Sequence, residues 1–344
     1  MNFSNKLLNW YKLNFRSLPW RNTKDPYKIW ISEIILQQTK IQQGLPYYKK
    51  FIKQFPTIFS LAKADQKHVI KLWQGLGYYS RAQNLHDTAK KVVTDYKGNF
   101  PQTHKEMMQL RGIGDYTASA IGSICFNNRE AVIDGNVYRF LGRYFGINYP
   151  IHTLKGFKTY KSRANELIST DSPGDFNQAM MDFGSIQCIP KKPNCEECIF
   201  SASCYAFINS KINLYPVKKR KNKIKTRYFN YLFICNSKNQ TVLKKRTTNG
   251  IWKNLYEFPL IETESTLNKP NIQFKKIISK YSKKKYKIDP VLLKSQIHKL
   301  SHQTLMIKFW KILLPDDTNL PIKKNQILSY AVPVVIEKFI DQYY

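Results

Sequence analysis

The spacing of hydrophobic residues changes once along this chain of 344 residues. Up to about residue 206 apolar residues recur every three or four positions, which predicts helices. Beyond Arg227 the runs YFNYLFIC, TVLKKR and LMIKFWKILL predict strands, and PVVIEKFIDQYY predicts a closing helix. A chain of this length can bury two cores. We therefore expect a mainly α domain over residues 1–208, an exposed basic linker over 209–226 and an α+β domain over 227–344.

The charge balance indicates a polyanionic partner. Lys and Arg number 56 against 23 Asp and Glu, a formal net charge of +33, which favours nucleic acid. An AT-rich genome also enriches Lys, Asn, Ile and Tyr, so charge alone does not establish that partner. No apolar run approaches the roughly 20 residues that cross a bilayer, and the first residues do not resemble a signal peptide. We expect a bacterial, cytoplasmic monomer with no membrane partner.

A short loop holds most of the cysteines. The segment CIPKKPNCEECIFSASC contains four of the six, with gaps of six, two and five residues: Cys188, Cys195, Cys198 and Cys204. Disulfides are not expected in a reducing compartment. Structural zinc commonly uses two separated Cys-x-x-Cys pairs, whereas a single pair inside one compact loop can enclose a cubane. The spacing therefore favours an iron–sulfur cluster over zinc.

Two carboxylates have positions that allow a functional role. In KIWISEIILQQTK, Glu33 follows Trp30 by three and Ile29 by four, on the inner side of the predicted helix. A buried charge is usually paired, neutralised or functional, but Glu33 at the edge of the apolar stripe beside a Lys is the alternative. Asp134 ends the apolar run AVID, where an Asp is commonly a helix cap. The functional alternative is a carboxylate facing a cleft.

A glycine-rich turn separates two predicted helices. In MQLRGIGDYTASAIGSICF one helix ends at Leu110, Gly112 and Gly114 follow, and an alanine-rich helix starts near Tyr116. The glycines allow backbone amides to turn outward, and with the next helix N-terminus they form a site for phosphate. A glycine-capped helix followed by a tight turn is the alternative.

Together these segments resemble a known family, the helix-hairpin-helix DNA glycosylases of the endonuclease III superfamily, and within it the adenine DNA glycosylases of the MutY type. The resemblance covers residues 18 to about 305 and rests on these motifs: LPWR, WISEIILQQT, GLGYYSRAQNL, LRGIGDYTASAI, IDGNVYRFLGR, FNQAMMDFGSIQC, the cysteine loop, IWKNLYEFP and HKLSHQTL. It implies a six-helix barrel, an iron–sulfur domain with one 4Fe–4S cluster, and a Nudix-like C-terminal domain that recognises 8-oxoguanine.

The resemblance also implies a reaction, in which duplex DNA loses adenine opposite 8-oxoguanine or guanine by hydrolysis of the N-glycosidic bond. Glu33 would protonate the flipped adenine, ionised Asp134 would stabilise an oxocarbenium-like state, and Asn136 would position the water or the sugar. Tyr116 stands where bifunctional relatives carry a Lys. A phenol cannot form an imine, so strand cleavage should be weak or absent.

Further positions are assigned to substrate and DNA contacts by the same resemblance: Trp20, Arg21, Leu36, Gln38, Thr39, Tyr78, Arg111, Gly112, Gly114, Gln178, Leu300 and Ser301. Gln38 and Tyr78 resemble residues that wedge into the base stack, and Ser301 resembles a Ser that binds the oxidised guanine. Core packing is the alternative for Trp20, Leu36 and Tyr78.

The sequence departs from the family pattern in a few places. Arg111 replaces a usual Pro, Gln178 a usual acidic residue, and Leu300 a usual aromatic residue. No Nudix box follows GIWKNLYEFP, so pyrophosphatase activity is not expected.

Two other functions fit part of the pattern. A pyrimidine-directed glycosylase and lyase is disfavoured by Tyr116 and by the appended domain. A non-enzymatic, basic iron–sulfur DNA-binding protein would explain the charge, the glycine turn and the cysteines. It leaves Glu33 and Asp134 without a role.

Overall fold

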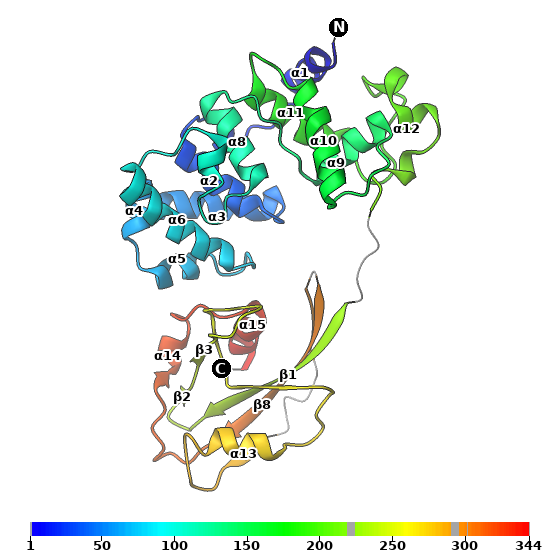
Figure 1. Cartoon of the computed structure of the whole chain (residues 1–344). Coiled ribbons are helices and arrows are strands. Elements are labelled where there is room, and N and C mark those ends of the chain that lie inside the picture. Colours follow the sequence, from blue (N-terminus) through cyan, green and yellow to red (C-terminus); the bar gives the residue numbers. More distant parts are fainter. Residues whose placement is uncertain (1, 219–223, 290–295, 301, 344) are drawn as a thin grey trace. The chain divides into compact units, whose positions relative to one another are not determined.

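The computed structural model describes residues 2–218, 224–289, 296–300 and 302–343 (Figure 1). It forms two compact units. The helical unit comprises Met1–Lys63 and Asn84–Lys221, and the mixed unit comprises Ala64–Gln83 and Asn222–Tyr344. The helix Ser80–Tyr96 therefore begins in the mixed unit and continues in the helical unit. Among the described residues, no helix combines the length and the apolar character needed to cross a membrane.

The helical unit consists of short helices joined by tight connections. Several begin at a side chain that accepts backbone N–H groups, as Asp25, Thr103 and Thr153 do. The helices are α1 (Phe3–Asn14), α2 (Pro26–Leu36), α3 (Ile41–Gln54), α4 (Ile58–Lys63), α6 (Ser80–Tyr96), α7 (His104–Met107), α8 (Asp115–Phe126), α9 (Gly135–Phe145), α10 (Leu154–Leu167), α11 (Pro173–Ile186) and α12 (Tyr205–Ile208), with single 3₁₀ turns η1 (Pro19–Arg21), η2 (Ser201–Ser203) and η3 (Ile212–Leu214).

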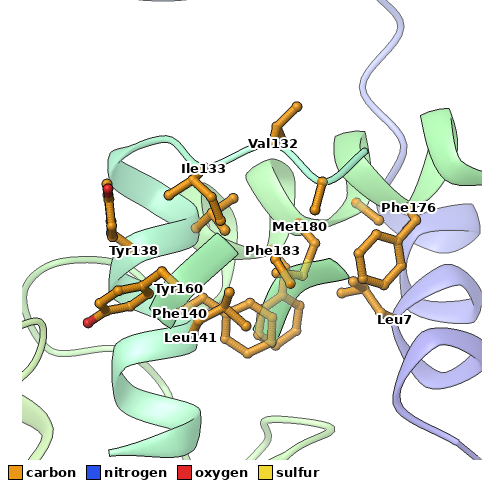
Figure 2. Packing of buried hydrophobic residues seen from close by; sticks show 14 of the residues in the cluster. Leu7, Val132, Ile133, Tyr138, Phe140, Leu141, Tyr160, Phe176, Met180 and Phe183 are labelled. Carbon is orange, nitrogen blue, oxygen red and sulfur yellow. The ribbon is translucent and has the colours of Figure 1, made fainter. Parts of the chain in front are cut away.

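The core of the helical unit lies between α1, α9 and α11 (Figure 2). Helical spacing directs Phe140 and Leu141 of α9 and Phe176, Met180 and Phe183 of α11 to the same interior. Each such side chain contributes about 1.5–3 kcal/mol when fully buried. This core fixes the two helices that carry much of the candidate site.

The mixed unit is built on a long parallel strand pair, β1 (Lys225–Cys235) with β8 (Gln303–Leu313). The other strands of its sheet pair antiparallel: β2 (Gln240–Thr241), β5 (Leu260–Thr263), β6 (Lys287–Asp289), β7 (Gln296–Lys299) and β9 (Ile322–Lys323). A separate pair and the remaining helices complete the unit: β3 (Lys244–Lys245), β4 (Tyr256–Glu257), α5 (Gln66–Leu72), α13 (Ile272–Ile278), α14 (Lys324–Ile327) and α15 (Val334–Tyr343).

Both faces of this sheet are covered. Along β1, Phe229, Tyr231 and Phe233 belong to one core, which includes residues of α15, while Leu232 and Ile234 belong to a second core with residues of α13. The period of two along a strand explains this division. The change from helical to strand periodicity predicted from the sequence is confirmed.

Two elements have a different extent in the structure from the extent predicted from the sequence. TVLKKR forms two very short strands, β2 and β3, in different sheets. The helix before the glycine turn ends at Met107 rather than at Leu110. It ends early because Gln109 and Leu110 already bond three residues back, to Glu106 and Met107, which tightens the chain into the turn.

Candidate active site

One cavity in the helical unit collects polar side chains from separate elements. Nine of the residues singled out in the sequence line it: Trp20, Arg21, Glu33, Leu36, Thr39, Tyr116, Asp134, Asn136 and Gln178. They come from η1, α2 and the turn after it, α8, the start of α9 and α11. Residues far apart in the sequence therefore share one pocket.

Glu33 lies on the inner side of α2. Its neighbours Ile29, Trp30 and Ile34 are buried, and Glu33 itself is only 9% exposed. Burial raises the pKa of Glu33 to about 7, although the hydrogen bond with the Tyr116 hydroxyl lowers it. A carboxyl with this pKa is partly protonated near neutral pH, as a proton donor must be.

Asp134 is both a helix cap and a wall of the cavity. One of its oxygens accepts the backbone N–H groups of Asn136 and Val137 at 2.9 and 2.7 Å, and the other accepts the Asn136 side-chain amide at 2.8 Å. Burial raises the pKa of Asp134 above its usual value, and these three donors offset part of that rise. The two interpretations left open by the sequence are therefore compatible, since capping α9 aims this carboxyl into the cavity.

Tyr116 lies beside Glu33 on the wall of the cavity. Its hydroxyl is 3.1 Å from Met181 Sδ and hydrogen-bonds Glu33. Burial and the nearby carboxyls hold the pKa of Tyr116 well above its usual range, so the phenol stays neutral.

A buried ion-pair network forms another wall, and the sequence analysis missed it. Asp182 is fully buried and accepts both terminal guanidinium nitrogens of Arg21 at 2.7 Å, while Arg16 forms a further ion pair with it. Beside it, the Tyr11 hydroxyl donates to Gln178 Oε1 at 2.9 Å. Both partners are buried, so this bond fixes the orientation of an amide that faces the cavity.

A signal for this wall does exist in the sequence. Gln178, Asp182 and Ser185 follow one another at spacings of four and three along helix α11, and all three line the cavity. One polar stripe on a buried helix predicts a shared polar site.

Asp182→Ala is expected to lower the free energy of unfolding of the protein by about 3–5 kcal/mol, because it leaves the Arg21 guanidinium buried without its partner. Urea unfolding of purified protein measures this loss. Glu166→Ala, which removes the exposed partner of Arg163, is the matched control and should cause no measurable change. Equal effects of the two substitutions would contradict the structural role of Asp182.

Arg139 connects the cavity to the cysteine loop through hydrogen bonds. Arg139 donates from Nη2 to Asn136 Oδ1 at 2.9 Å and from Nε to the carbonyl of Cys188 at 2.7 Å. One turn later, Arg143 donates to Cys188 Sγ at 3.4 Å and to the carbonyl of Ile189 at 2.8 Å. Helix α9 therefore carries Asp134 at its start and holds the loop further along.

The cysteine loop provides a donor set that suits a cluster. Its four cysteines line one pocket together with Phe140, Phe183 and Phe200. Among the described residues, no group of three or more His, Cys, Asp or Glu side chains is arranged to hold a metal ion. The four thiols lie around one pocket and an arginine donates to one of the sulfurs, so the residues present could serve as ligands of a metal cluster.

The glycine turn contains a left-handed backbone conformation that favours glycine. Gly112 has φ of +82°, and a Cβ there would lie 2.9 Å from Asn84 Cβ. Gly114 caps α8 with open space where its Cβ would be, so a ligand can approach the first amides of the helix. The Arg111 side chain pairs with Asp87 at 2.7 Å in this structure.

The remaining predicted residues lie elsewhere. Gln38 is exposed with φ of +56° and lines an adjoining cavity with Glu33, Tyr116 and Asp134. In the mixed unit, Tyr78 and Leu300 line a pocket that also includes Trp252 and His298. Ser301 lies outside the described residues.

Two known family models match parts of this chain. A family model described as "HhH-GPD superfamily base excision DNA repair protein" matches residues 31–169, and one described as "NUDIX domain" matches residues 230–342. Fold and site thus define a helix-hairpin-helix DNA repair protein with a Nudix-like C-terminal domain. The adenine DNA glycosylase of Buchnera aphidicola subsp. Baizongia pistaciae (strain Bp) is 38% identical over 90% of this chain and 86% of its own length. The chain belongs to the adenine DNA glycosylases.

Solved structures resemble the helical region. A thermostable thymine-DNA glycosylase has a TM-score of 0.56 and 32% identity, covering 60% of this chain and 95% of its own. A trapped endonuclease III–DNA covalent intermediate has a TM-score of 0.52 and 17% identity, covering 60% of this chain and 94% of its own, which shows the shared fold. The family resemblance found in the sequence is confirmed.

Proposed function

We propose that this protein flips adenine out of duplex DNA where it opposes 8-oxoguanine or guanine, and hydrolyses its N-glycosidic bond. The observation that carries this proposal is the presence of two carboxyls on one cavity, the buried Glu33 and the half-buried Asp134. They have different surroundings, because Asp134 accepts three N–H donors while Glu33 lies among apolar side chains. Opposed protonation states of two nearby carboxyls are typical of acid–base catalysis.

In this mechanism Glu33, in its neutral form, donates its proton to N7 of the flipped adenine and makes the base a better leaving group. Positive charge then develops on the sugar, and the ionised Asp134 stabilises it. Asn136, bonded to Asp134 and Arg139, orients the water or the sugar. Tyr116 contributes a neutral hydroxyl and no imine-forming amine, so the enzyme is monofunctional.

Base and backbone recognition are divided between the units. Trp20, Arg21, Leu36, Thr39 and Gln178 would line the adenine pocket. The turn at Gly112 and Gly114 would bind phosphate through its amides, with Arg111 available after release from Asp87. Gln38 and Tyr78 would fill the gap left by the flipped base. Leu300 and Ser301 would contact the oxidised guanine.

The finer organisation is also part of this proposal. The helical region would comprise a six-helix barrel and an iron–sulfur domain within residues 1–208, followed by a basic linker over 209–226 and a lesion-recognition domain over 227–344. The protein would act as a monomer in the bacterial cytoplasm.

One 4Fe–4S cluster is proposed as the cofactor, held by the four cysteines of the loop. When bound, it would order the loop and present its basic residues to the phosphate backbone. Purified protein is expected to be coloured, with broad absorption near roughly 400 nm. Cys198→Ala should lose this absorption, whereas the isolated Cys125→Ala should keep it. Colourless protein with stoichiometric zinc would contradict the assignment.

The direct test of function is incubation with a duplex that carries adenine opposite 8-oxoguanine, analysed with and without alkali. Strand breaks that appear only after alkali support a monofunctional adenine glycosylase. Breaks without alkali would indicate a lyase, and no breaks would indicate a DNA-binding protein. A duplex with a G·T mismatch is a useful second arm because one structural neighbour is a thymine-DNA glycosylase. Release of thymine in preference to adenine would overturn the substrate assignment.

A further inference from the structure

A dense run of lysines lies on the mixed unit and has no role in the function proposed above. The segment KKIISKYSKKKYK, residues 275–287, contains seven lysines and no acidic residue. All seven are exposed, and we call them the lysine patch: Lys275, Lys276, Lys280, Lys283, Lys284, Lys285 and Lys287. Lys284 is ion-paired with Asp317, which leaves six lysines for an external partner.

The fold presents this patch on one side of the sheet. Helix α13 packs through Phe274 and Ile278 into the core that contains Leu232 and Trp310. Six of the lysines lie on the exposed surface of α13 or in the segment between α13 and β6, and Lys287 is the first residue of β6. The patch is also extended, since Lys244 of β3 lies over the Tyr281 ring at 5.7 Å. A genome-wide bias toward lysine does not explain seven lysines within thirteen consecutive residues that include no acidic residue.

The patch faces away from the pocket that contains Leu300. Trp252 and Leu300 pack against the core of Phe229 and Tyr231, on the opposite face of β1 from α13. Figure 1 shows α13 and α15 on the two sides of β1 and β8. A duplex is stiff over about 150 base pairs, and bending a short site by 40–90° costs about 1–6 kcal/mol. One short stretch of duplex therefore cannot easily contact both faces.

We propose that the lysine patch binds the phosphate backbone of a second duplex segment, separate from the segment that contains the mismatch. This inference rests on the DNA-directed function proposed above. Lysines contact phosphates without reading sequence, so the second segment is undamaged, arbitrary DNA. Such a face allows the enzyme to pass directly from one duplex to another while it searches for its target.

The test uses the full chain and two variants of equal charge. The patch variant replaces Lys276, Lys280, Lys283 and Lys285 with Gln. The control variant replaces exposed lysines of α3 and α4 with Gln: Lys49, Lys50, Lys53 and Lys63. Each protein is bound to a labelled short duplex, unlabelled undamaged duplex is added at increasing concentration, and the rate of label release is measured.

For the wild type and the control variant, release is expected to accelerate as competitor concentration rises, because the second duplex is captured before the first dissociates. For the patch variant, release should not depend on competitor concentration. Its affinity for undamaged DNA should also depend less on salt, with a slope smaller by about 0.9 for each phosphate that the variant no longer neutralises. Release independent of competitor in the wild type, or equal acceleration in the patch variant, would overturn the proposal.

Adenine release from a single short duplex is measured in parallel. It should be the same in all three proteins, since that reaction needs only one duplex. Absence of adenine release in all of them would contradict the proposed function, and it would leave the competitor experiment as an independent test of the patch.

Discussion

Glu33→Gln is expected to reduce single-turnover release of adenine by about 10²–10⁴-fold while the protein still binds the mismatched duplex. Gln has nearly the same shape and fills the same buried position, but it has no proton to donate to N7. Excision under saturating enzyme and the dissociation constant for the same duplex, measured side by side, separate catalysis from binding.

Glu166→Gln is the matched control, because it makes the same chemical change at an exposed position of the helical unit. It should leave both quantities unchanged. Undiminished excision by Glu33→Gln would remove Glu33 from the mechanism, and parallel loss of binding would assign it to substrate contact instead.

Asp134→Asn should reduce adenine release by about 10²–10³-fold, since the variant loses the negative charge that stabilises the developing cation. Asn is as good a helix cap as Asp, so α9 and the stability of the fold should be retained. Asp134→Ala removes both the charge and the helix cap. Its free energy of unfolding should be lower than that of Asp134→Asn by about 1 kcal/mol.

Comparing these two substitutions separates the roles of Asp134. Single-turnover excision and urea unfolding are measured for both. If Asp134→Asn kept nearly full activity, Asp134 would be a helix cap and nothing more.

The sequence predicted the parts of the site that reside in a single motif. Glu33 could be placed on a buried helix side because helical spacing links it to Trp30, and Asp134 could be placed at a helix start because it follows an apolar run. The boundaries of small elements were less predictable. Whether the chain at Leu110 stays helical depends on turn hydrogen bonds that compete locally with the helix.

Side-chain partners that are distant in the sequence could not be predicted. Asp182 meets Arg21 across 161 positions and Tyr11 meets Gln178 across 167, so these pairs follow only from the placement of η1 and α1 beside α11. The same holds for Arg139, whose carbonyl partner belongs to a loop about fifty residues further on. Such contacts arise from tertiary packing, which the spacing of residues along one sequence does not specify.

The most direct test of the central claim is the pH dependence of single-turnover adenine release between about pH 5 and pH 9. Protonated Glu33 is the active form, and its pKa in the folded protein is raised to about 7, so the rate should fall as pH rises through that value with the loss of one proton. Tyr116→Phe removes a hydrogen bond that lowers this pKa, so it should move the midpoint to higher pH. A rate that stays constant up to about pH 9 would contradict proton donation by Glu33.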